Sequence, residues 1–434
     1  MKILVVGGGG REHAIVWRIA NNPDGTQYEI YCAPGNGGIA QLAKCVPIKA
    51  TDIQGLCDFA EKKKIDYTII GMDDPLALGV VDAFKARGLR VFGPTKEAAK
   101  IEWSKAFSKA FMKKYNIPTA EYGVFEDYES ALEYIRGAAN WPVVVKADGL
   151  AVGKGVYICE GLESAERALR ELMLDKKFGG SGEKVVIEEY LEGPEVTVLA
   201  FCDGKTLAPM PASTDYKRAF DNDKGPNTGG MGVICPSPFY TEELEERCWK
   251  EIFTPTIDGF ISEGIDFKGF LYFGLIMTAR GPYVIEYNAR LGDPETQAVF
   301  ALLKTDLVKI CCACDNEMLD KMNISWDNVR SSVCIIMASG GYPGVYTTNL
   351  PISGLEKIQH NQGFVENNYA VVFHAGTAKT PETDGFVTAG GRVLGITALG
   401  NSLFEARDHA YEFVKGIEFK DMHYRRDIGN FYGD

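Results

Sequence analysis

The sequence predicts a multidomain protein that combines α/β and α+β units. A chain of 434 residues is too long for one hydrophobic core, so two to four compact units are expected. Strand-like and helical stretches alternate over the first hundred residues, and the pattern then changes to β-rich segments divided by helices. These observations predict an N-terminal parallel-sheet domain at 1–103, an α+β domain at 104–327 and a mixed β/α C-terminal domain at 328–434.

The N-terminal domain is predicted from short apolar runs that lie between helical segments. The segments REHAIVWRIANN and DIQGLCDFAEKKK have helical patterns and separate apolar runs of strand length. Such a series of βαβ units predicts a parallel sheet. The expected strands cover residues 3–6, 29–33, 67–71 and 90–93.

The middle domain mixes strands and helices. The helical segment ESAERALRELML divides the strand-like segments WPVVVKA and VYIC from VVIEEYL and VTVLAF. The glycine-rich segment DNDKGPNTGGMG has the composition of a mobile loop. The segments LYFGLIMT and YVIEYNA, joined by ARGP, predict a β-hairpin.

The C-terminal domain begins at about residue 328. Its expected strands are SSVCIIMAS, AVVFHAG and GGRVLGITALG, and they precede the helical segment SLFEARDHAYEFVKGI. No internal repeat or low-complexity linker separates the three domains.

Composition narrows the possible functions. A net charge of −13 argues against nonspecific binding to nucleic acid or to membrane surfaces, although a local basic cluster can still bind an anionic substrate. Eleven cysteines without framework spacing predict free thiols in a reducing compartment, and Cys311, Cys312 and Cys314 are interpreted as a buried helix face. The apolar run at the N-terminus is too short for a signal peptide, and no run reaches membrane-spanning length. We therefore expect a cytoplasmic protein.

The first glycine-rich loop, GGGGREH, follows the first predicted strand and opens a helix. Free N–H groups at a helix N-terminus bind anions, so Gly9, Gly10 and Arg11 are candidates to bind a phosphate. The dinucleotide fingerprint G-x-G-x-x-G fails here, which disfavours NAD or FAD. A tight turn that only starts the helix is the alternative. The loop APGNGG lies at the same edge of the predicted sheet.

The second glycine-rich segment is VVVKADGLAVGKGV. It is one residue too short for a Walker P-loop and lacks the final hydroxyl residue. It instead places Lys146 on a strand and follows it with a flexible loop that contains Gly153, Lys154 and Gly155. Lysine acts as a point charge toward phosphate, so this segment predicts a nucleotide site with a movable flap. An ordinary glycine hairpin with solvated lysines is the alternative.

Two further strand ends carry polar groups. The strand in VIEEYLEGPE enters an acidic hinge that could receive adenine, with backbone groups near Tyr190 and Leu191 and with Glu195 at the ribose. In YVIEYNARLGDPETQ, alternation places Val284, Glu286 and Asn288 on one face, with Arg290 next in the row. Two oxygen ligands with this spacing suit Mg²⁺, which also takes oxygens from water and phosphate. The alternative is a solvated acidic strand end in the first case and an exposed polar face in the second.

Together these segments resemble the ATP-grasp superfamily, and within it the phosphoribosylamine–glycine ligase family. The resemblance extends from end to end. It rests on GGGGREHA, APGNGG, VFGPT, SKAF, NIPTAEY, VVVKADGLAVGKGV, VIEEYLEGPE, KGPNTGGMG, GFLYFGL, VIEYNARLGDPETQ, ASGGYPG, FHAGT and GGRVLGITALG, which occur in this order. One departure is GMDDPLALGV, where the family pattern has Gly-Pro-Glu, so that Asp73 or Asp74 is expected to supply the carboxylate.

The resemblance implies an enzyme of purine biosynthesis that joins glycine to 5-phosphoribosylamine with ATP through a glycyl phosphate. It implies ATP with Mg²⁺ or Mn²⁺ held by Glu286 and Asn288, phosphates on Lys105 and Lys146, and a flexible small subdomain at about 120–191. The adenosine would lie against Glu188, Tyr190, Leu191 and Glu195. Arg290 would stabilise charge at the γ-phosphate.

The resemblance also implies where the acceptor lies. The phosphate of phosphoribosylamine is expected at Gly9, Gly10 and Arg11, with Asn36 and Gly37 nearby. A lid would cover the intermediate, because acyl phosphates hydrolyse. The expected lid and substrate residues are Asp215, Lys217, Arg218, Thr228, Gly229, Gly230, Met231 and Gly232, with Asp293 as a further substrate contact.

Three other functions stay open from the sequence. They are a different ATP-grasp ligase or carboxylase, a dehydrogenase that uses the first glycine loop, and a nucleotide-binding regulatory module without turnover. For the ligase we expect only small-molecule substrates (glycine, phosphoribosylamine and ATP), no nucleic acid or membrane partner, and a monomer.

Overall fold

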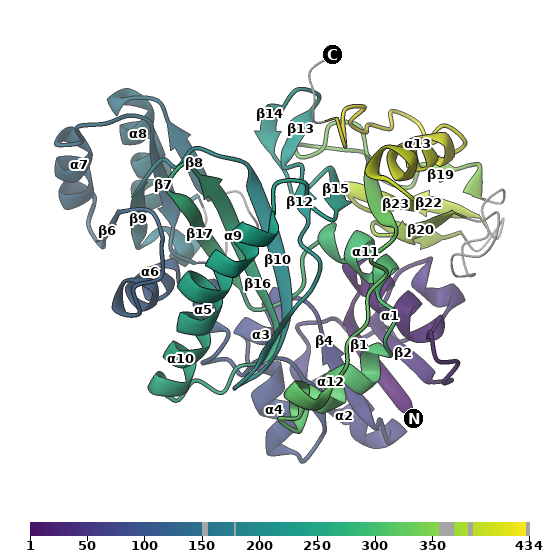
Figure 1. Ribbon diagram of the computed structural model, residues 1–434. Helices are drawn as coiled ribbons and strands as arrows, with labels where there is room; N and C mark the ends of the chain where they lie inside the picture. Colours follow the sequence, from purple (N-terminus) through teal and green to yellow (C-terminus); the bar gives the residue numbers. More distant parts are fainter. Residues whose placement is uncertain (150–154, 178, 356–368, 381–384, 431–434) are drawn as a thin grey trace.

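The computed structural model describes residues 1–149, 155–177, 179–355, 369–380 and 385–430. Figure 1 shows three parts: the N-terminal part at the lower right, the C-terminal part above it, and a long twisted sheet that leads to a smaller lobe at the left. The predicted fold class, α/β and α+β in several domains, is confirmed. Gly153 and Lys154, which the sequence predicts to lie at the nucleotide, are outside the described residues.

The N-terminal part is a parallel sheet with strand order β3-β2-β1-β4-β5. Its central strand β1 is buried along ILVV, as a strand covered by helices on both faces requires. The strands are β1 (Lys2–Gly7), β2 (Glu29–Pro34), β3 (Lys44–Cys45), β4 (Tyr67–Ile70) and β5 (Val91–Phe92). The helices are α1 (Gly10–Ala20), α2 (Ile53–Lys63), α3 (Asp73–Ala77) and α4 (Val80–Ala86).

The smaller lobe is a four-stranded antiparallel sheet with order β6-β9-β7-β8, covered by α7 and α8 (Figure 1). Helix α6 leads into it and is capped by Ser104, whose hydroxyl accepts from the Phe107 amide. The elements are α5 (Lys100–Trp103), α6 (Lys105–Lys114), β6 (Tyr122–Phe125), α7 (Tyr128–Arg136), β7 (Val143–Ala147), β8 (Val156–Cys159), α8 (Leu162–Leu169) and β9 (Val185–Glu189).

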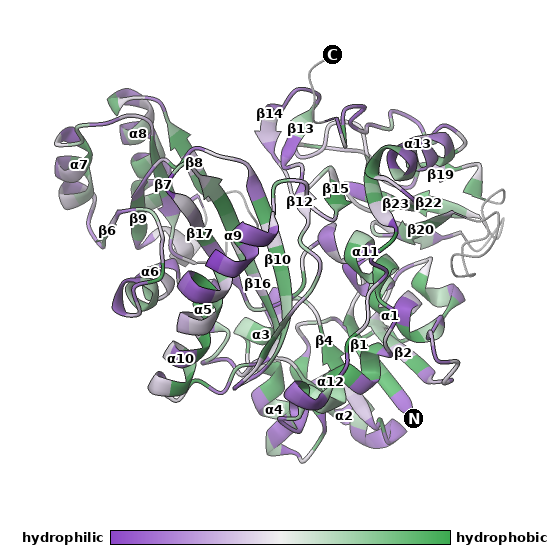
Figure 2. Ribbon diagram, in the orientation of Figure 1, coloured by the Kyte–Doolittle hydropathy of each residue, from purple (hydrophilic) through white to green (hydrophobic). Residues whose placement is uncertain are grey.

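The long antiparallel sheet has order β11-β10-β16-β17, and its β16–β17 hairpin confirms the hairpin predicted from the sequence. Its apolar strands pack into the two largest core clusters, which Figure 2 shows as green inner strands. The elements are β10 (Glu195–Asp203), β11 (Leu207–Pro209), α9 (Glu242–Cys248), α10 (Thr254–Glu263), β16 (Lys268–Thr278), β17 (Gly281–Asn288), α11 (Glu295–Val299) and α12 (Leu307–Asp315).

The C-terminal sheet, with order β12-β15-β18-β23-β20, includes two strands from the middle of the chain. Because β15 pairs with β18, this sheet joins both sides of the predicted 327/328 boundary, and the boundaries stay predictions. A small sheet, β19-β22-β21, and helix α13 complete this part. The elements are β12 (Thr214–Asp215), β15 (Gly232–Cys235), β18 (Ser331–Ala338), β19 (Pro351–Ile352), β20 (Ala370–His374), β21 (Thr377–Lys379), β22 (Phe386–Thr388), β23 (Arg392–Gly400) and α13 (Leu403–Val414).

The glycine-rich segment that the sequence predicts as a loop contains an antiparallel hairpin, β13 (Arg218–Phe220) and β14 (Lys224–Asn227). Residues of the C-terminal segment hold this hairpin: His423 lies against the Ala219 carbonyl, and Arg425 bonds the carboxylate of Asp223. Local composition gave no signal for these contacts, because their partners lie about 200 positions away in the sequence.

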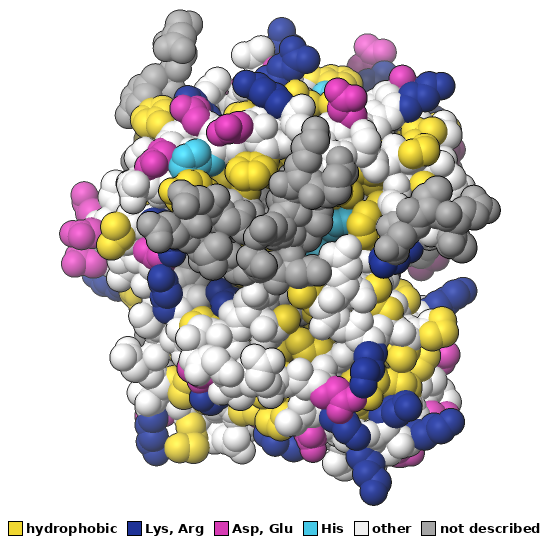
Figure 3. All heavy atoms as spheres, turned by 90° about the vertical axis from the view of Figure 1, so that its right-hand side faces the viewer, with side chains coloured by type: hydrophobic (Ala, Val, Ile, Leu, Met, Phe, Trp, Pro, Cys, Tyr) yellow, Lys and Arg dark blue, Asp and Glu magenta, His cyan; other side chains and the backbone are white. Residues whose placement is uncertain are grey.

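The surface carries both signs of charge. On the face shown in Figure 3, basic and acidic side chains occur on the upper and on the lower half. Within the described part of the chain, no helix is both long enough and apolar enough to cross a membrane. Cys311 and Cys314 are buried on α12, as the sequence predicted, while Cys312 is half-buried.

Candidate active site

Residues from all three parts of the molecule line one cavity of about 480 Å³. The long sheet and the smaller lobe form most of its wall, the N-terminal part contributes Arg11 and Asp73, and the C-terminal part contributes Arg392. The predicted site residues found on this wall are Arg11, Lys105, Lys146, Gly155, Glu188, Tyr190, Leu191, Glu195, Asp215, Lys217, Thr228, Gly229, Glu286, Asn288, Arg290 and Asp293.

One end of the cavity holds a buried cluster of lysines around Glu188. The Nζ of Lys146 on β7 lies 2.9 Å from Glu188 Oε2 on β9, and the Nζ of Lys109 on α6 lies 3.2 Å from the same oxygen. Burial lowers the pKa of Lys109 to about 8, although Glu188 acts to raise it. The second oxygen of Glu188 is buried and has no hydrogen-bond partner in the described part of the chain. A bound base that donates a hydrogen bond could satisfy it.

Apolar side chains continue the wall beside this cluster. Met112, Val144, Ile158 and Ile276 line the cavity next to Tyr190 and Leu191. Such a slot suits a flat aromatic base that is hydrogen-bonded only at its edge. Lys105 reaches the same region, where its Nζ donates to the Gly149 carbonyl at 3.2 Å. Burial lowers the pKa of Lys105, and Glu286 partly offsets this.

The polar row predicted for the hairpin lies on β17, with one change. A register shift opposite Gly274 and Leu275 adds Ile285 as an extra residue, so that both Ile285 and Glu286 line the cavity. Val284 is buried in the core, and the expectation that it shares a face with Glu286 is therefore wrong. Strict alternation could not reveal the bulge. Glu286 and Asn288 still lie together on the cavity wall.

Glu286 is surrounded by cations. Burial alone would raise its pKa, but Lys217, Lys146, Lys105 and Arg290 together lower it, so the carboxylate is ionised. In the described part of the chain, no group of three or more His, Cys, Asp or Glu side chains could hold a metal by itself. Glu286 and Asn288 offer a carboxylate and an amide oxygen on the cavity wall, and such a pair fits a divalent ion that completes its coordination with water and phosphate oxygens.

Arg290 is held by a carboxylate that the sequence did not single out. Its Nε lies 3.1 Å from Glu102 Oε1, and the other Glu102 oxygen accepts from the Ala289 amide at 2.8 Å. Burial raises the pKa of Glu102 to about 6, against the effect of Arg290. Asp73 also faces this cation: burial acts to raise its pKa, but Arg290 and Arg11 lower it. The structure thus places Asp73 in the cavity, at the position where the family pattern has glutamate.

A cluster of acidic residues, Glu195, Asp215 and Glu295, lies around Lys217, which pairs with Glu195 on β10. Burial raises the pKa of Asp215 to about 7, Glu295 and Glu195 add to this, and Lys217 opposes it. Burial acts to lower the pKa of Lys217, but Glu195 and Asp215 raise it well above its ordinary value. The cavity therefore presents two cations, Arg290 and Lys217, beside Asp215 and Glu295, a combination that suits a small zwitterion.

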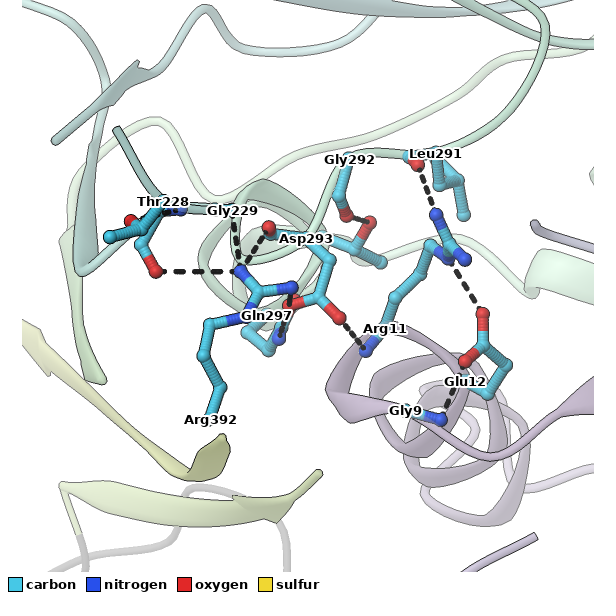
Figure 4. A network of polar contacts seen from close by, with 12 residues as sticks. Gly9, Arg11, Glu12, Thr228, Gly229, Leu291, Gly292, Asp293, Gln297 and Arg392 are labelled. Atoms are coloured by element: carbon cyan, nitrogen blue, oxygen red, sulfur yellow. Dashed lines mark hydrogen bonds and ion pairs between the residues drawn. The ribbon is translucent and has the colours of Figure 1, made fainter. Parts of the chain in front are cut away.

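The N-terminus of α1 faces Asp293 and Arg392 (Figure 4). Arg392 donates to the carbonyls of Gly229 and Asp293 at 2.5 and 2.6 Å and lies 3.4 Å from the Asp293 carboxylate. The Arg11 amide lies 3.4 Å from the other Asp293 oxygen, and its guanidinium binds Glu12 and the Leu291 carbonyl. Arg392 was missed because GGRVLG reads only as the start of a strand.

Several predicted residues hold this region together instead of lining the cavity. The Gly9 amide donates to Glu12 at 2.7 Å, and Gly10 begins α1. The Asn36 amide group donates to the carbonyls of Gly8 and His374, and its oxygen accepts from two backbone amides. Gly37 contacts Phe386, Gly230 lies against Pro294, and Met231 is buried in the ladder beside Tyr216.

Comparisons with known proteins agree along the whole chain. Three family models match in succession: the phosphoribosylglycinamide synthetase N domain at 1–102, its ATP-grasp (A) domain at 103–296 and its C domain at 332–431. The phosphoribosylamine–glycine ligase of Clostridium acetobutylicum is 46% identical over 429 residues, covering 99% of both chains. That of Vibrio vulnificus is 47% identical over 432 residues, covering 99% of this chain and 98% of the relative.

Solved structures show the same architecture. The crystal structure of phosphoribosylamine–glycine ligase from Thermotoga maritima has a TM-score of 0.83 at 33% identity and covers 99% of this chain and 100% of that one. A biotin carboxylase domain from Hydrogenobacter thermophilus, solved with MgADP and bicarbonate, has a TM-score of 0.70 at 17% identity, over 96% of this chain and 90% of that one, which shows a shared fold. ATP-grasp domains use ATP with divalent metal ions. The chain therefore belongs to the phosphoribosylglycinamide synthetase family, from its N domain through its ATP-grasp domain to its C domain.

Proposed function

We propose that this protein ligates glycine to 5-phospho-D-ribosylamine with ATP, giving N1-(5-phospho-D-ribosyl)glycinamide, ADP and phosphate. The observation that carries this proposal is the convergence of Lys105, Lys146, Lys217 and Arg290 with Glu286 and Asn288 on one cavity. A carboxylate and a triphosphate repel each other by about 4 kcal/mol per pair of unit charges at 4 Å and an effective dielectric near 20. Cations from separate segments remove this barrier.

The nucleotide lies at the lysine-rich end of the cavity. Its base enters the slot beside Tyr190 and Leu191, where the free oxygen of Glu188 accepts from an exocyclic amino group. Lys105 and Lys146 neutralise the α- and β-phosphates, with Gly155 beside them. Glu286 and Asn288 would hold Mg²⁺ or Mn²⁺, and the ion would neutralise charge on the β- and γ-phosphates.

The substrate glycine lies between the two cations, Arg290 and Lys217, and the acidic side chains beside them. Arg290 and Lys217 orient its carboxylate, and ionised Asp215 with Glu295 receives its ammonium group. The carboxylate oxygen attacks the γ-phosphorus, the bond to the β-phosphate oxygen breaks, and ADP leaves. Arg290, held by Glu102, stabilises the charge that develops on the transferred group.

The acceptor enters from the side of α1. Arg11 and Arg392 bind its phosphate, while Asp73 and Asp293 receive ribose hydroxyls. Its amine then attacks the carbonyl carbon of glycyl phosphate, phosphate leaves, and the product amide loses a proton. Thr228 and Gly229 close the wall beside this position and limit the access of water.

Release of ADP in the presence of freshly generated phosphoribosylamine tests this function. We expect it to depend on glycine and to be at least about tenfold slower with alanine or serine, because an added side chain meets the buried acidic cluster. A different amino acid or bicarbonate as the preferred substrate would show that the chain is another kind of ATP-grasp enzyme.

We also propose a cytoplasmic monomer that binds neither nucleic acid nor membranes, and light scattering of the purified protein tests the oligomeric state.

Arg11→Ala should weaken the acceptor far more than the nucleotide. Loss of a charge-assisted contact is expected to raise the KM for phosphoribosylamine roughly 10- to 100-fold, while the KM for ATP changes by less than about threefold, since the two ends of the cavity are separate. Arg87→Ala is the control, because it removes an arginine that is ion-paired to Asp58 on the surface of the same domain. Equal losses for both substrates would remove the assignment of the acceptor site.

Asp215 should make glycine binding depend on pH. Only its ionised form attracts an ammonium group, so kcat/KM for glycine is expected to fall as the pH drops below about 7. Asp215→Asn should be slow at every pH and lack this fall in kcat/KM at low pH.

The raised pKa of Asp215 also affects stability: it favours the folded state below a pH of about 3.8, and this effect is lost as the pH rises through about 7. As the pH rises from about 3.8 to about 7, the melting temperature of Asp215→Asn should therefore increase relative to that of the parent enzyme. Melting temperatures that differ by the same amount at every pH would contradict the raised pKa of Asp215.

A further inference from the structure

A buried arginine near the C-terminus, Arg425, contacts Tyr216, which lies between Asp215 and Lys217 in an extended segment. Arg425 is 1% exposed. Its Nε and one terminal nitrogen bind both oxygens of Asp427, at 2.8 and 2.7 Å. The other terminal nitrogen lies 2.7 Å from Asp223 and 3.2 Å from the Arg218 carbonyl. One guanidinium thus joins the C-terminal segment to strand β13 and to the turn of the β13–β14 hairpin.

The same guanidinium covers the ring of Tyr216. Its central carbon lies 5.0 Å from the ring centroid, and the Gly429 amide donates to the tyrosine hydroxyl at 3.0 Å. Cations over aromatic faces attract the ring, most strongly where water is excluded. Tyr216 also packs against the apolar cluster of the C-terminal sheet. Contacts from residues 425–429 therefore fix this side chain on two sides.

Tyr216 stands between the two residues that face the cavity. The backbone is extended here, because the Tyr216 amide donates to the Gly232 carbonyl and the Tyr216 carbonyl accepts from Met231. Successive side chains of an extended segment point to opposite faces. With Tyr216 fixed on the C-terminal side, Asp215 and Lys217 point into the cavity, where both are found. The Lys217 carbonyl also accepts from the amide and the hydroxyl of Thr228, another cavity residue.

The segment that supplies Arg425 is itself held by a helix. The Tyr411 hydroxyl on α13 donates to the Arg425 carbonyl at 2.9 Å and accepts from the Ile428 amide at 3.0 Å. The Asn222 amide bonds to Asp427, and the Arg426 amide bonds to Asp221. Figure 1 shows the hairpin at the top of the molecule.

We propose that Arg425 is a positioning residue for the ligation: together with Tyr216 it forms an anchor that aims Lys217 and Asp215 at the substrate. This inference rests on the proposed function, in which these two side chains hold glycine. Arg425 and Tyr216 are not among the residues that line the cavity. Loss of the anchor frees the segment 215–217 to shift, and small displacements of positioned groups cost large factors in rate.

The first test compares Arg425→Met with Arg426→Met, whose side chain is exposed and removes the same charge one position later. For Arg425→Met we expect the KM for glycine to rise at least about tenfold, with the KM for ATP within about twofold of the parent value. Arg425→Lys, which keeps the charge over the ring, should lie between the two. A purely structural role would lower the amount of folded enzyme and leave both KM values unchanged.

The second test does not depend on the reaction. Hydrogen exchange followed by mass spectrometry should show faster exchange across residues 213–233 in Arg425→Met, and parental exchange in the N-terminal sheet. Asp223→Asn is a milder variant at a side chain that is 71% exposed, and it removes one carboxylate that holds Arg425. Asp223→Asn should show a smaller rise in the KM for glycine and a smaller increase in exchange across residues 213–233. If Arg425→Met does not fold, these two measurements on Asp223→Asn test the proposal.

The outcomes separate the anchor from the function. A parent enzyme without glycine-dependent ADP release refutes the proposed function, while the exchange experiment still judges the anchor. Folded Arg425 and Asp223 variants with parental glycine KM and parental exchange overturn the anchor. A parallel rise in the KM values for ATP and glycine overturns it as well, because the anchor acts only through Lys217 and Asp215.

Discussion

Glu286→Gln is expected to abolish most metal-dependent turnover while the protein still folds. The substitution keeps the size of the side chain but removes the only charged ligand of the proposed metal site, and Lys217, Lys146, Lys105 and Arg290 then surround a neutral group. A metal ion contributes several kcal/mol to charge stabilisation in phosphoryl transfer, so kcat should fall at least about 100-fold. Steady-state ADP release over a range of Mg²⁺ and Mn²⁺ concentrations measures this effect.

The control for Glu286→Gln is Glu121→Gln, which removes the same charge from an exposed residue outside the cavity. Its kcat and its metal dependence should match the parent enzyme. Thermal melting of both variants checks the fold. If Glu286→Gln retained parental activity and the same half-saturating metal concentration, the assignment of the β17 row to the metal would be wrong.

Arg290→Met is expected to have the second large effect, a loss of about 10³ in kcat, because an arginine that stabilises transferring phosphoryl groups has this value in related chemistry. The KM for ATP should change little, since Lys105 and Lys146 still hold the other phosphates. The loss also leaves Glu102 buried without its cation, so the pKa of this carboxyl, already about 6 through burial, should rise further.

Arg290→Lys separates charge from geometry. Lysine supplies the charge but not the planar fork that reaches Glu102, the Asn288 oxygen and the substrate together, and it should recover only a small part of the lost rate. The matched control is Arg247→Met, because Arg247 lies on α9 and pairs with Glu251. A parental kcat in Arg290→Met would remove Arg290 from the chemistry and leave it a structural role beside Glu102.

The sequence revealed those parts of the site that lie within one segment. Lys146 could be placed because a strand runs directly into a glycine-rich loop. Glu286 and Asn288 could be placed because both lie beyond the bulge, where the strand alternates regularly. The parallel sheet of the N-terminal part was predictable for a similar reason, since each strand and helix carries its own periodicity.

The remaining parts depend on contacts between distant segments. Glu102 on α5 becomes a partner of Arg290 only after the chain has folded across 188 positions, and Lys109 joins Glu188 from another helix. Arg392 begins a strand and gives no local sign that it will bind the Asp293 loop. Glycine content predicted a loop at this segment, and nothing nearby in the sequence indicated that Arg425 and Asp427, about 200 positions later, would bond to the hairpin it contains.

A structure of the protein with a nonhydrolysable ATP analogue, a divalent ion and glycine tests the central claim most directly. We predict that the triphosphate lies between Lys105 and Lys146 on one side and Glu286 and Asn288 on the other, with the glycine carboxylate between Arg290 and Lys217. A triphosphate bound away from β7 and β17, or a glycine bound outside this cavity, would contradict the account.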